Sequence, residues 1–582
     1  SAVLDGWLEY DGVNWNTLET TGEGGALAIR YRLKSKFAKF LHGARGGAWG
    51  LKTTQCVKDG TTTVGYYPFL WIGDQERGLC FFAETRRGWT ANEKTAYTIE
   101  KGADETVVTV AVAKKLDAAK PLRIQFGLQA TPMRPLSDSH PYDTIGSSYG
   151  AALNRPDAPH VVDACLMASD NVKSGDTASF FGDLDDAKGR MTGTAQQQIH
   201  KMLEPWPDVR FVPYTCARWL SLRYPEAAAY VNDWMIRPEI VLDNEGTGHR
   251  MVDMCPASKA SDYYCWRFRK LLERLPKVNG IYCDFGTINE CSNGDHGCDG
   301  RIPILAYREY VRRLVSVQLD HGIKKPIVML HNTDCNQYPC LSFATHLYNG
   351  ENVRQASSAL LHDKKDILDS YGLEMFACEL GTLPLGVSNG GYMPFDTLNK
   401  KNGGDEATAP YQFRMGKAAF AGSLIHDNFP SQNRGHFGLY DKVFRVYGAF
   451  GVGKSAKFVG YWKEFAANDG TGVYVSAYTD GKKVLAVIGH VDKAHQDQDV
   501  SITFDWAKLG LGSAAPTKAT DTLTEPDPDY PWLYQRMKQY HVPVWRCSLD
   551  IGDFGTKVLS FDGKTLKYHL PFHSFGLVEL VP

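Results

Sequence analysis

Four acidic residues stand at or just beyond the ends of short apolar segments in the middle of the chain. They close the runs Ile281-Tyr-Cys-Asp284, Tyr348-Asn-Gly-Glu351, Phe376-Ala-Cys-Glu379 and Leu424-Ile-His-Asp427. A carboxyl group at the end of a buried strand is costly unless it is paired, hydrogen-bonded or functional. Cleavage of a glycosidic bond uses two carboxyl groups, one as proton donor and one as nucleophile or base. Several acids around one site could supply that pair.

Asp284 and Glu351 are the candidate catalytic pair. Asp284 would act as nucleophile, base or stabiliser of an oxocarbenium-like transition state, and Glu351 as general acid. Each has a structural alternative: Asp284 could cap the following loop, and Glu351 could be an exposed loop residue. Glu379 and Asp427 could bind sugar hydroxyls or position a water, or could have structural roles only.

Other polar and aromatic side chains near the same segment ends are candidate substrate-binding residues. The imidazole and amide groups could bond hydroxyls or a developing charge. The arginine could contact an anion, and a neighbouring tryptophan could stack on a sugar ring. Structural histidines and a packing role for the arginine and tryptophan are the alternatives. The residues are Tyr214, Arg218, Trp219, His331, Asn332 and His426.

The segment 289–298 is rich in metal-ligand residues. Cys291, His296 and Cys298, with Cys283 as a fourth, could form a metal site, although zinc sites usually show two close pairs. A Cys291–Cys298 disulfide that pins the loop and a set of free thiols are the alternatives. The chain has 13 cysteines, an odd number, so at least one has no partner within the chain. We therefore assign no metal and no cofactor.

The elements that would position these residues alternate between strand and helix. The expected strands are Val161–Met167, Val209–Tyr214, Glu239–Leu242, Gly280–Asp284, Pro326–His331, Ala344–Tyr348, Glu374–Glu379 and Ser423–Asp427. The expected helices are Thr194–Leu203, Pro225–Trp234, Ala260–Arg274, Ile304–His321 and Lys364–Tyr371. This alternation predicts parallel β/α units, and over residues 141–445 it predicts a (β/α)8 TIM-like barrel. An open doubly wound sheet is the alternative, without any glycine-rich nucleotide motif to support it.

The flanking regions have the short alternating runs of antiparallel sheets. Residues 1–140 and 446–582 are each expected to form a β-sandwich. A chain of 582 residues exceeds what one hydrophobic core holds, so several domains are expected. The net charge of −2 gives no field that would attract nucleic acid, and no apolar run is long enough to span a membrane. The 12% aromatic content suits either sugar stacking or sheet cores.

Several motifs resemble a known family. They are the run Trp71–Trp89 (WIGDQERGLCFFAETRRGW), Asn279–Phe285, the loop that ends in His296-Gly-Cys298, Ala306-Tyr-Arg-Glu309 and Gly350-Glu351. These residues resemble a bacterial glycoside-hydrolase-like family, long known as a domain of unknown function, that is similar to the family 123 β-N-acetylgalactosaminidases. The resemblance extends over roughly residues 60 to 440. It implies a sandwich, barrel, sandwich order and a role in polysaccharide degradation.

Family 123 enzymes use an adjacent Asp and Glu together with the acetamido group of the substrate. Here Asp284 is followed by Phe285, so Glu351 would have to supply the acid from another strand. We therefore expect a secreted or periplasmic glycoside hydrolase that acts on a polysaccharide or oligosaccharide, with no nucleic-acid partner. A non-catalytic carbohydrate-binding protein on a degenerate barrel and a polysaccharide lyase with a Tyr or His base are the alternatives.

Overall fold

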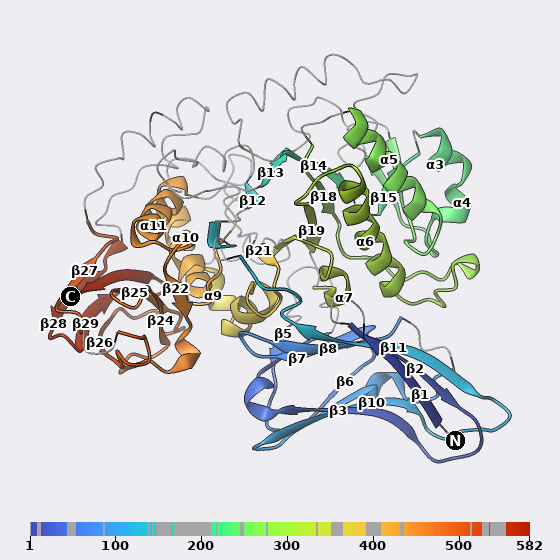
Figure 1. Cartoon of the computed structure of the whole chain (residues 1–582), viewed down its shortest axis with the longest axis horizontal. Coiled ribbons are helices and arrows are strands. Elements are labelled where there is room, and N and C mark those ends of the chain that lie inside the picture. Colours follow the sequence, from blue (N-terminus) through green and yellow to red (C-terminus); the bar gives the residue numbers. More distant parts are fainter. Residues whose placement is uncertain are drawn as a thin grey trace. The chain divides into compact units, whose positions relative to one another are not determined.

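The computed structural model describes most of the chain. The described residues are 2–8, 13–43, 54–84, 88–137, 140–142, 145–146, 164–167, 211–216, 218–222, 224–244, 249–274, 278–332, 336–350, 365–391, 409–430, 436–511, 515–525, 535 and 554–582. Contacts divide the chain into two compact units (Figure 1). The first comprises Ser1–Pro135, Leu166–Tyr348 and Leu383–Val387, and the second Leu136–Cys165, Asn349–Thr382 and Ser388–Pro582. The boundaries of the three expected domains stay a prediction.

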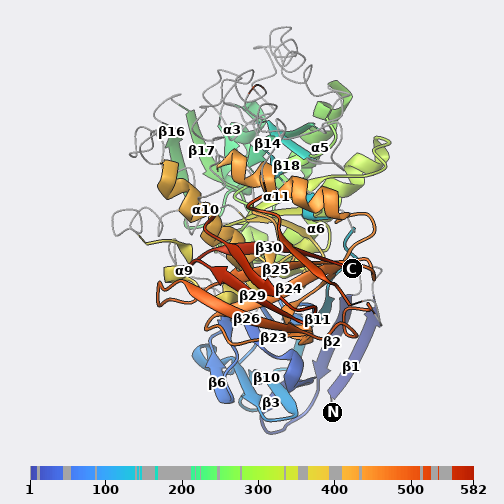
Figure 2. The same cartoon turned by 90° about the vertical axis from the view of Figure 1, so that its left-hand side faces the viewer.

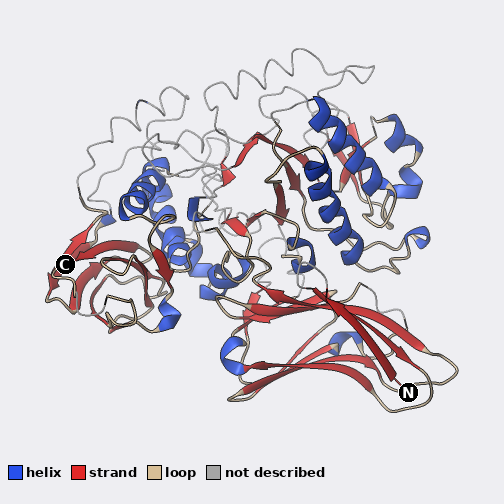
Figure 3. Ribbon diagram, viewed as in Figure 1, coloured by secondary structure: helices blue, strands red, loops and turns tan. Residues whose placement is uncertain are grey.

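The N-terminal part of the first unit is a β-sandwich. One sheet has the order β1 (Ala2–Leu8), β2 (Val13–Thr20), β11 (Leu122–Thr131), β8 (Gly78–Phe82), β7 (Phe69–Gly73), β4 (Phe40–His42) and β5 (Thr54–Cys56). The other has the order β3 (Leu27–Lys34), β10 (Glu105–Ala113), β9 (Tyr97–Lys101) and β6 (Gly60–Val64). Short 3-10 turns occur at Ser35–Phe37 and Glu93–Thr95. Figure 3 shows this region as two layers of strands.

Alternation along the strands explains this sandwich. In β10 the buried residues recur at every second position, and Val108 and Val110 point into a core that both sheets share. The hairpin β7–β8 is shaped around Trp71, whose Nε1 donates to Thr131 Oγ1 at 3.0 Å. Gly73 and Gly78 leave room for the indole, because a Cβ at either residue would lie within 2.4 Å of its ring. The spacing of the Trp71 motif is therefore a packing requirement.

The second part of the first unit contains four neighbouring strands of a seven-stranded sheet. They are, in this order, β14 (Phe211–Cys216), β18 (Ile281–Asp284), β19 (Val328–Asn332) and β20 (His346–Asn349). The pairs β14–β18 and β18–β19 are parallel, with Cys216 opposite Asp284. Two amphipathic helices, α5 (Ala260–Arg274) and α6 (Ile304–Asp320), pack against each other (Figure 1). Both were predicted, and this local order confirms parallel β/α structure.

Smaller elements complete the first unit. A three-stranded antiparallel sheet has the order β15 (Trp219–Ser221), β17 (His249–Asp253) and β16 (Val241–Asn244). The short helices are α3 (Pro225–Ala229), α4 (Val231–Trp234), the 3-10 turn η6 (Gly294–His296) and α7 (Tyr338–Leu341). Tyr338 of α7 stacks on Trp71 with ring centroids 5.3 Å apart. This stack fastens the loop after β19 to the sandwich.

The second unit ends in another β-sandwich (Figure 2). One sheet has the order β22 (Lys457–Val459), β24 (Val473–Thr479), β25 (Val484–His490), β30 (Phe575–Val581) and β27 (Lys518–Asp521). The other has the order β23 (Ala466–Asn468), β26 (Gln498–Phe504), β29 (Thr565–Leu570) and β28 (Lys557–Phe561). Every residue of β25 is buried, because one face contacts the second sheet and the other faces α10 (Ala409–Leu424). This explains its continuous apolar sequence.

The second unit contains further elements outside this sandwich. They are η3 (His140–Tyr142), the parallel pair β12 (Ile145–Gly146) and β13 (Ala164–Met167), α9 (Ile367–Ser370), the π-helix η7 (Met375–Glu379), β21 (Ser388–Gly391), α11 (Phe437–Phe450) and the 3-10 turn η11 (Tyr461–Lys463). Among the described residues, none of the helices is long and apolar enough to cross a membrane.

The structure corrects part of the expected barrel. Glu374–Glu379 was expected to be a strand but is a π-helix, and Ser423–Asp427 is the end of α10 and a turn. The strand expected at Glu239–Leu242 belongs to the small antiparallel sheet. Short, fully buried apolar runs look alike in strands and helices, so periodicity could not separate them. The described residues thus contain a parallel sheet but not a closed eight-stranded barrel, and the expected helix Thr194–Leu203 lies outside them.

Candidate active site

A sharp turn follows β18 and holds the candidate catalytic residue Asp284. Phe285 has φ +50°, a conformation that bulky residues rarely adopt. The N–H of Gly286 donates to the His331 carbonyl at 2.6 Å, and the Tyr307 hydroxyl donates to the Gly286 carbonyl at 2.6 Å. A Cβ on Gly286 would lie 2.8 Å from the His331 carbonyl oxygen, so only glycine fits here. Strained backbone that its surroundings hold in place is common at functional sites.

The Asp284 carboxylate contacts His331 at the end of the neighbouring strand. Its Oδ1 lies 2.9 Å from His331 Nδ1 and accepts the Phe285 N–H at 2.8 Å. The Asp284 side chain is 14% exposed, and that of His331 is 5% exposed. Tyr282 places its hydroxyl 2.5 Å from the same imidazole nitrogen, and Tyr348 packs edge-on against the ring. The imidazole is therefore held in one orientation beside the acid.

Arg218 and Trp219 lie on the other side of the turn. The Arg218 guanidinium is 5.6 Å from the centroid of Phe285 and 5.9 Å from that of Trp219, a cation–π arrangement. Arg218 Nη1 lies 3.5 Å from Asp253 Oδ2, which also accepts a 2.7 Å hydrogen bond from Asn289. The indole meets Phe285 edge-on and is 6% exposed. This geometry fits the packing role that was the alternative for Trp219.

Three buried polar groups of the site have no hydrogen-bond partner within the described part of the chain. They are both side-chain atoms of Asn332, Arg218 Nε and Trp219 Nε1. Asn332 is fully buried at the end of β19, and its Oδ1 would be 3.1 Å from a Cβ on Gly286. Buried polar groups are normally hydrogen-bonded, so each of these atoms is suited to a sugar hydroxyl or an ordered water.

The side chains of two further predicted residues lie outside the described part of the chain. Tyr214 lies in β14 opposite Tyr282 in the strand register, and its side chain is not among the described ones. Glu351 lies outside the described residues, two positions beyond the end of β20. Of the predicted residues, the structure thus gathers Arg218, Trp219, Asp284, His331 and Asn332 around one turn in the first unit.

Asp427 of the second unit has a different environment. His140 Nε2 lies 3.1 Å from Asp427 Oδ2, and the Tyr478 hydroxyl donates to Oδ1 at 2.5 Å. Burial alone would lower the pKa of His140, but the Asp427 charge and its hydrogen bond raise that pKa to about 9. Asp427 is 4% exposed and is therefore one half of a buried ion pair.

The other two predicted residues of the second unit are also buried. His426 Nδ1 lies 2.7 Å from the Gly422 carbonyl and Nε2 lies 3.2 Å from the Tyr461 hydroxyl. Burial lowers the pKa of His426 to about 4, so the imidazole is neutral. Glu379 is 2% exposed in the π-helix, and its carbonyl accepts hydrogen bonds from Asn349 and Asn389. Convergence of all four acids on one site stays a prediction, because these residues belong to the other unit.

Sequence reasoning missed some residues that the site uses. Asp253 closes the apolar end of β17 and could have been found as another acid at a strand end. Tyr282 and Phe285 lie within two residues of Asp284, but nothing in their type indicates a contact with His331 or Arg218. Of the three alternatives for Cys291 and Cys298, the disulfide is not formed, since both thiols are free. Their neighbour in space is Cys255, and Cys283 is not part of this cluster.

Comparison with known proteins gives one family match. Residues 440–525, from α11 to the segment after β27, match the model described as "Glycoside hydrolase 123, C-terminal domain". None of the curated proteins matches the chain. The match lies beyond the residues 60 to 440 that carried the resemblance in sequence, so it is independent support for the relation to family 123.

The solved structures that match this chain share little sequence identity with it. The GH36 α-galactosidase AgaA of Geobacillus stearothermophilus is 10% identical, with 82% of this chain and 71% of that chain covered and a TM-score of 0.40. An α-galactosidase of Lactobacillus brevis is 10% identical, with coverages of 84% and 72% and a TM-score of 0.40. The maltogenic α-amylase AmyB of Thermotoga neapolitana is 10% identical, with coverages of 72% and 91% and a TM-score of 0.38.

The family match decides the class of protein. A C-terminal domain of family 123 occupies the start of the second sandwich, in a chain whose other motifs independently resemble the same group. The chain is a glycoside hydrolase related to glycoside hydrolase family 123.

Proposed function

We propose that the chain hydrolyses a glycosidic bond in a polysaccharide or complex glycan at the turn after β18. Asp284 is the catalytic carboxylate, and Glu351 is the general acid. The observation that carries this proposal is the contact between Asp284 and His331 at the ends of adjacent parallel strands, 2.9 Å apart. Ligand and catalytic sites of parallel α/β folds lie at this edge of the sheet.

The surroundings of Asp284 suit a reactive carboxylate. The imidazole Nδ1 of His331 lies 2.9 Å from Oδ1, and the Phe285 N–H donates to the same oxygen. Such donors stabilise the ionised carboxylate, which is the form that acts as nucleophile or base or stabilises a cationic transition state. His331 thereby acts as a positioning residue, because it fixes the direction of the carboxylate.

The neighbouring polar atoms suit binding of a sugar. The Asn332 amide, Arg218 Nε and Trp219 Nε1 offer donors and an acceptor in a buried environment. Buried donors and acceptors discriminate strongly between substrates that do and do not satisfy them. The arginine also suits an anionic group, so a sulfated or uronic sugar is a natural member of the panel of test substrates. The location that fits such substrates is a secreted or periplasmic one.

The test is hydrolysis of a panel of aryl glycosides and oligosaccharides by the wild-type chain, Asp284→Asn and Glu351→Gln. Loss of a general acid or base typically lowers the rate about 10²–10⁴-fold, and we expect kcat to fall in that range for both variants. His331→Asn should lower kcat less and change its pH profile, because this residue acts through Asp284. Full activity in both acid variants would remove the site assignment.

Asp320→Asn is the matched control. Asp320 ends α6, is exposed, and undergoes the same chemical change far from the turn in sequence. Its activity should equal that of the wild type. Glycan binding without turnover by the wild-type chain would instead indicate a non-catalytic binding protein. Release of unsaturated products that absorb in the near ultraviolet would indicate a lyase.

A further inference from the structure

Three cysteines from two separate segments meet below the loop that follows β18. Cys255 lies just after β17, while Cys291 and Cys298 belong to the loop before α6. All three are buried, and their Sγ atoms lie within 4.8 Å of one another. Three thiols cannot all be paired in disulfides, and the Cys255–Cys298 separation of 3.7 Å exceeds the roughly 2.05 Å of an S–S bond.

A fourth ligand group lies beside the cluster. His296 Nδ1 lies 3.3 Å from Cys291 Sγ. In a tetrahedral zinc site with Zn–S near 2.3 Å and Zn–N near 2.0–2.1 Å, two sulfurs are about 3.8 Å apart and a sulfur and a nitrogen about 3.6 Å apart. The Cys255–Cys298 and Cys291–His296 separations are close to these edge lengths. The three sulfurs therefore outline one face of a coordination shell. His296 lies beside Cys291 but not within 4.8 Å of all three sulfurs, so its ring would move toward the ion to complete the shell.

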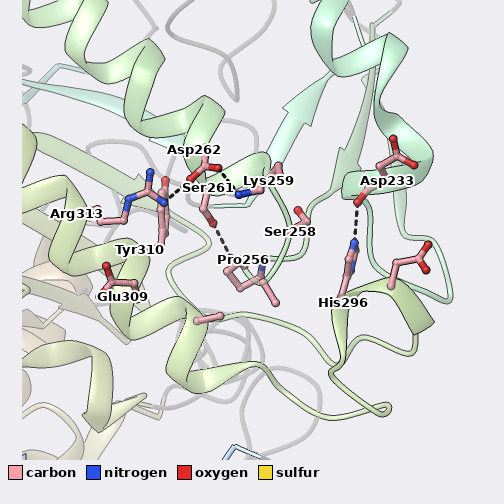
Figure 4. A pocket seen from close by; sticks show the side chains of 13 residues that line it. Asp233, Pro256, Ser258, Lys259, Ser261, Asp262, His296, Glu309, Tyr310 and Arg313 are labelled. Carbon is pink, nitrogen blue, oxygen red and sulfur yellow. Dashed lines mark hydrogen bonds and ion pairs between the residues drawn. The ribbon is translucent and has the colours of Figure 1, made fainter.

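The imidazole of His296 is oriented as in a metal site. Its Nε2 lies 2.7 Å from the Asp233 carbonyl oxygen, and Figure 4 shows this contact. A carbonyl can only accept, so the ring proton is on Nε2 and the Nδ1 lone pair faces the sulfurs. Metal-ligating histidines almost always donate their other ring N–H to a carbonyl or carboxylate in this way.

The loop is built to hold this arrangement. Asn293 caps the 3-10 turn η6 by accepting the Asp295 N–H, and Gly297 at φ +68° reverses the chain between His296 and Cys298. A backbone hydrogen bond from Asn293 also reaches the Cys291 sulfur. A donor in this position stabilises a thiolate. The thiolate is the form that binds a metal.

We propose that Cys255, Cys291, Cys298 and His296 bind one zinc ion as a closed structural site. Three sulfurs and one imidazole nitrogen are a donor set that zinc prefers in tetrahedral geometry, and hard cations such as Mg²⁺ and Ca²⁺ avoid it. Four protein ligands leave no open position for a substrate or water. The ion holds structure and performs no chemistry on the glycan.

The zinc ion would fasten the loop after the candidate active site. Cys291 and Cys298 follow Asp284 on that loop, while Cys255 follows Asp253, which accepts the hydrogen bond from Asn289. The ion thus cross-links the two segments that flank the turn of Asp284. His296 lines a surface pocket together with Asp233 and Pro256, so the ion can enter from solvent (Figure 4).

The first experiment measures metal in the full-length chain. We expect one zinc per chain by elemental analysis after dialysis against metal-free buffer. A mercurial thiol reagent should release that zinc, and a chromogenic chelator reports it. After exchange into cobalt, the chain should show the intense red-region bands of a tetrahedral site and a thiolate charge-transfer band in the near ultraviolet. These readouts do not depend on hydrolysis, so they stand apart from the proposed function.

Variants identify the ligands. Cys255→Ser and Cys291→Ser should each lose the zinc, and His296→Ala should hold it less tightly against a competing chelator. Cys56→Ser is the matched control, because Cys56 is an exposed cysteine of the sandwich, and this variant should keep one zinc. Should a cysteine variant not fold, the mercurial and cobalt experiments on the wild type still decide. A disulfide within the cluster, found by mass spectrometry of the unreduced chain, or an absence of bound zinc and of cobalt bands would overturn the proposal.

Discussion

Asp284 and Asp427 are both acids that follow apolar runs, yet their carboxylates differ in exposure and in the groups they contact. Asp427 is 4% exposed, and its two carboxylate oxygens contact His140 and the Tyr478 hydroxyl. Asp284 is 14% exposed, and its Oδ1 contacts both His331 and a backbone N–H. Each acid has a histidine 2.9–3.1 Å away, so the presence of a histidine partner does not distinguish them.

The difference lies in the partners and the exposure of the two carboxylates. Both oxygens of Asp427 have side-chain partners, His140 and Tyr478, as expected for a buried ion pair that holds structure. In the site of Asp284, the amide of Asn332, Arg218 Nε and Trp219 Nε1 have no partner within the described residues, and such atoms suit a ligand. Backbone conformation does not separate the two sites, because Asp427 has φ +58° and Phe285 has φ +50°.

The largest expected effect follows from removing the charge of Asp427. Asp427→Asn leaves His140 as a buried cation without its counter-charge, and breaking such pairs typically costs about 3–5 kcal/mol. We expect the free energy of unfolding to fall by that amount in chemical denaturation. Asp284→Asn is the comparison and should change the free energy of unfolding by less than about 1 kcal/mol, because the site is partly exposed. Equal losses of stability in the two variants would erase the distinction between the acids.

A second prediction concerns the stability of the second unit at alkaline pH. The pKa of His140 is raised from 6.5 to about 9, so the folded chain binds this proton more tightly than the unfolded chain. Its contribution is fully present below the unfolded pKa and is lost as pH rises through the folded pKa. At about 1.4 kcal/mol per pKa unit, we expect a loss of about 3 kcal/mol between pH 6 and pH 9.

The measurement is the free energy of unfolding of the wild type and of His140→Gln across that range. The difference between the two should shrink as pH rises, since glutamine does not titrate. A difference that stays constant from pH 6 to pH 9 would contradict the ion pair.

The sequence predicted local elements well and their assembly less well. The helices Ala260–Arg274 and Ile304–His321 came from a clear amphipathic period, and the strand that ends at Asp284 came from an abrupt change from apolar to acidic. The run Glu374–Glu379 failed because it is buried all round, and such a run carries no period. Parallel strands at Glu374–Glu379, Ser423–Asp427 and Glu239–Leu242 would have extended the sheet, so these wrong assignments together suggested a fuller barrel.

The candidate site was predictable only where residues lie close in sequence. Asp284, His331 and Asn332 end neighbouring strands, and strand ends are where a parallel sheet collects its functional groups. Cys255 could not be added to Cys291 and Cys298, because the approach of the segment after β17 to the loop is a tertiary event. For the same reason the partner of Asp427, His140, is not visible in the sequence around either residue.

The smallest expected effect comes from another buried histidine, His42, whose contribution to stability should change with pH in the opposite direction to that of His140. His42 Nε2 accepts the N–H of Asn336 at 3.0 Å, and its Nδ1 lies 2.9 Å from Thr54 Oγ1, so the imidazole is neutral. Burial lowers the pKa of His42 from 6.5 to about 3. The unfolded chain then binds this proton more readily, and stability is lost as pH falls below 6.5, by about 1.4 kcal/mol at pH 5.5.

Chemical denaturation of the wild type and of His42→Gln between pH 5.5 and pH 7.5 measures this term. The amide oxygen of glutamine can accept the Asn336 N–H without titrating, so the variant should lose less stability on acidification than the wild type. The slope has the opposite sign to that of His140, although burial acts on both imidazoles. The carboxylate of Asp427 reverses the sign of the slope for His140. Equal pH profiles for His42→Gln and the wild type would show that burial of His42 does not control its charge.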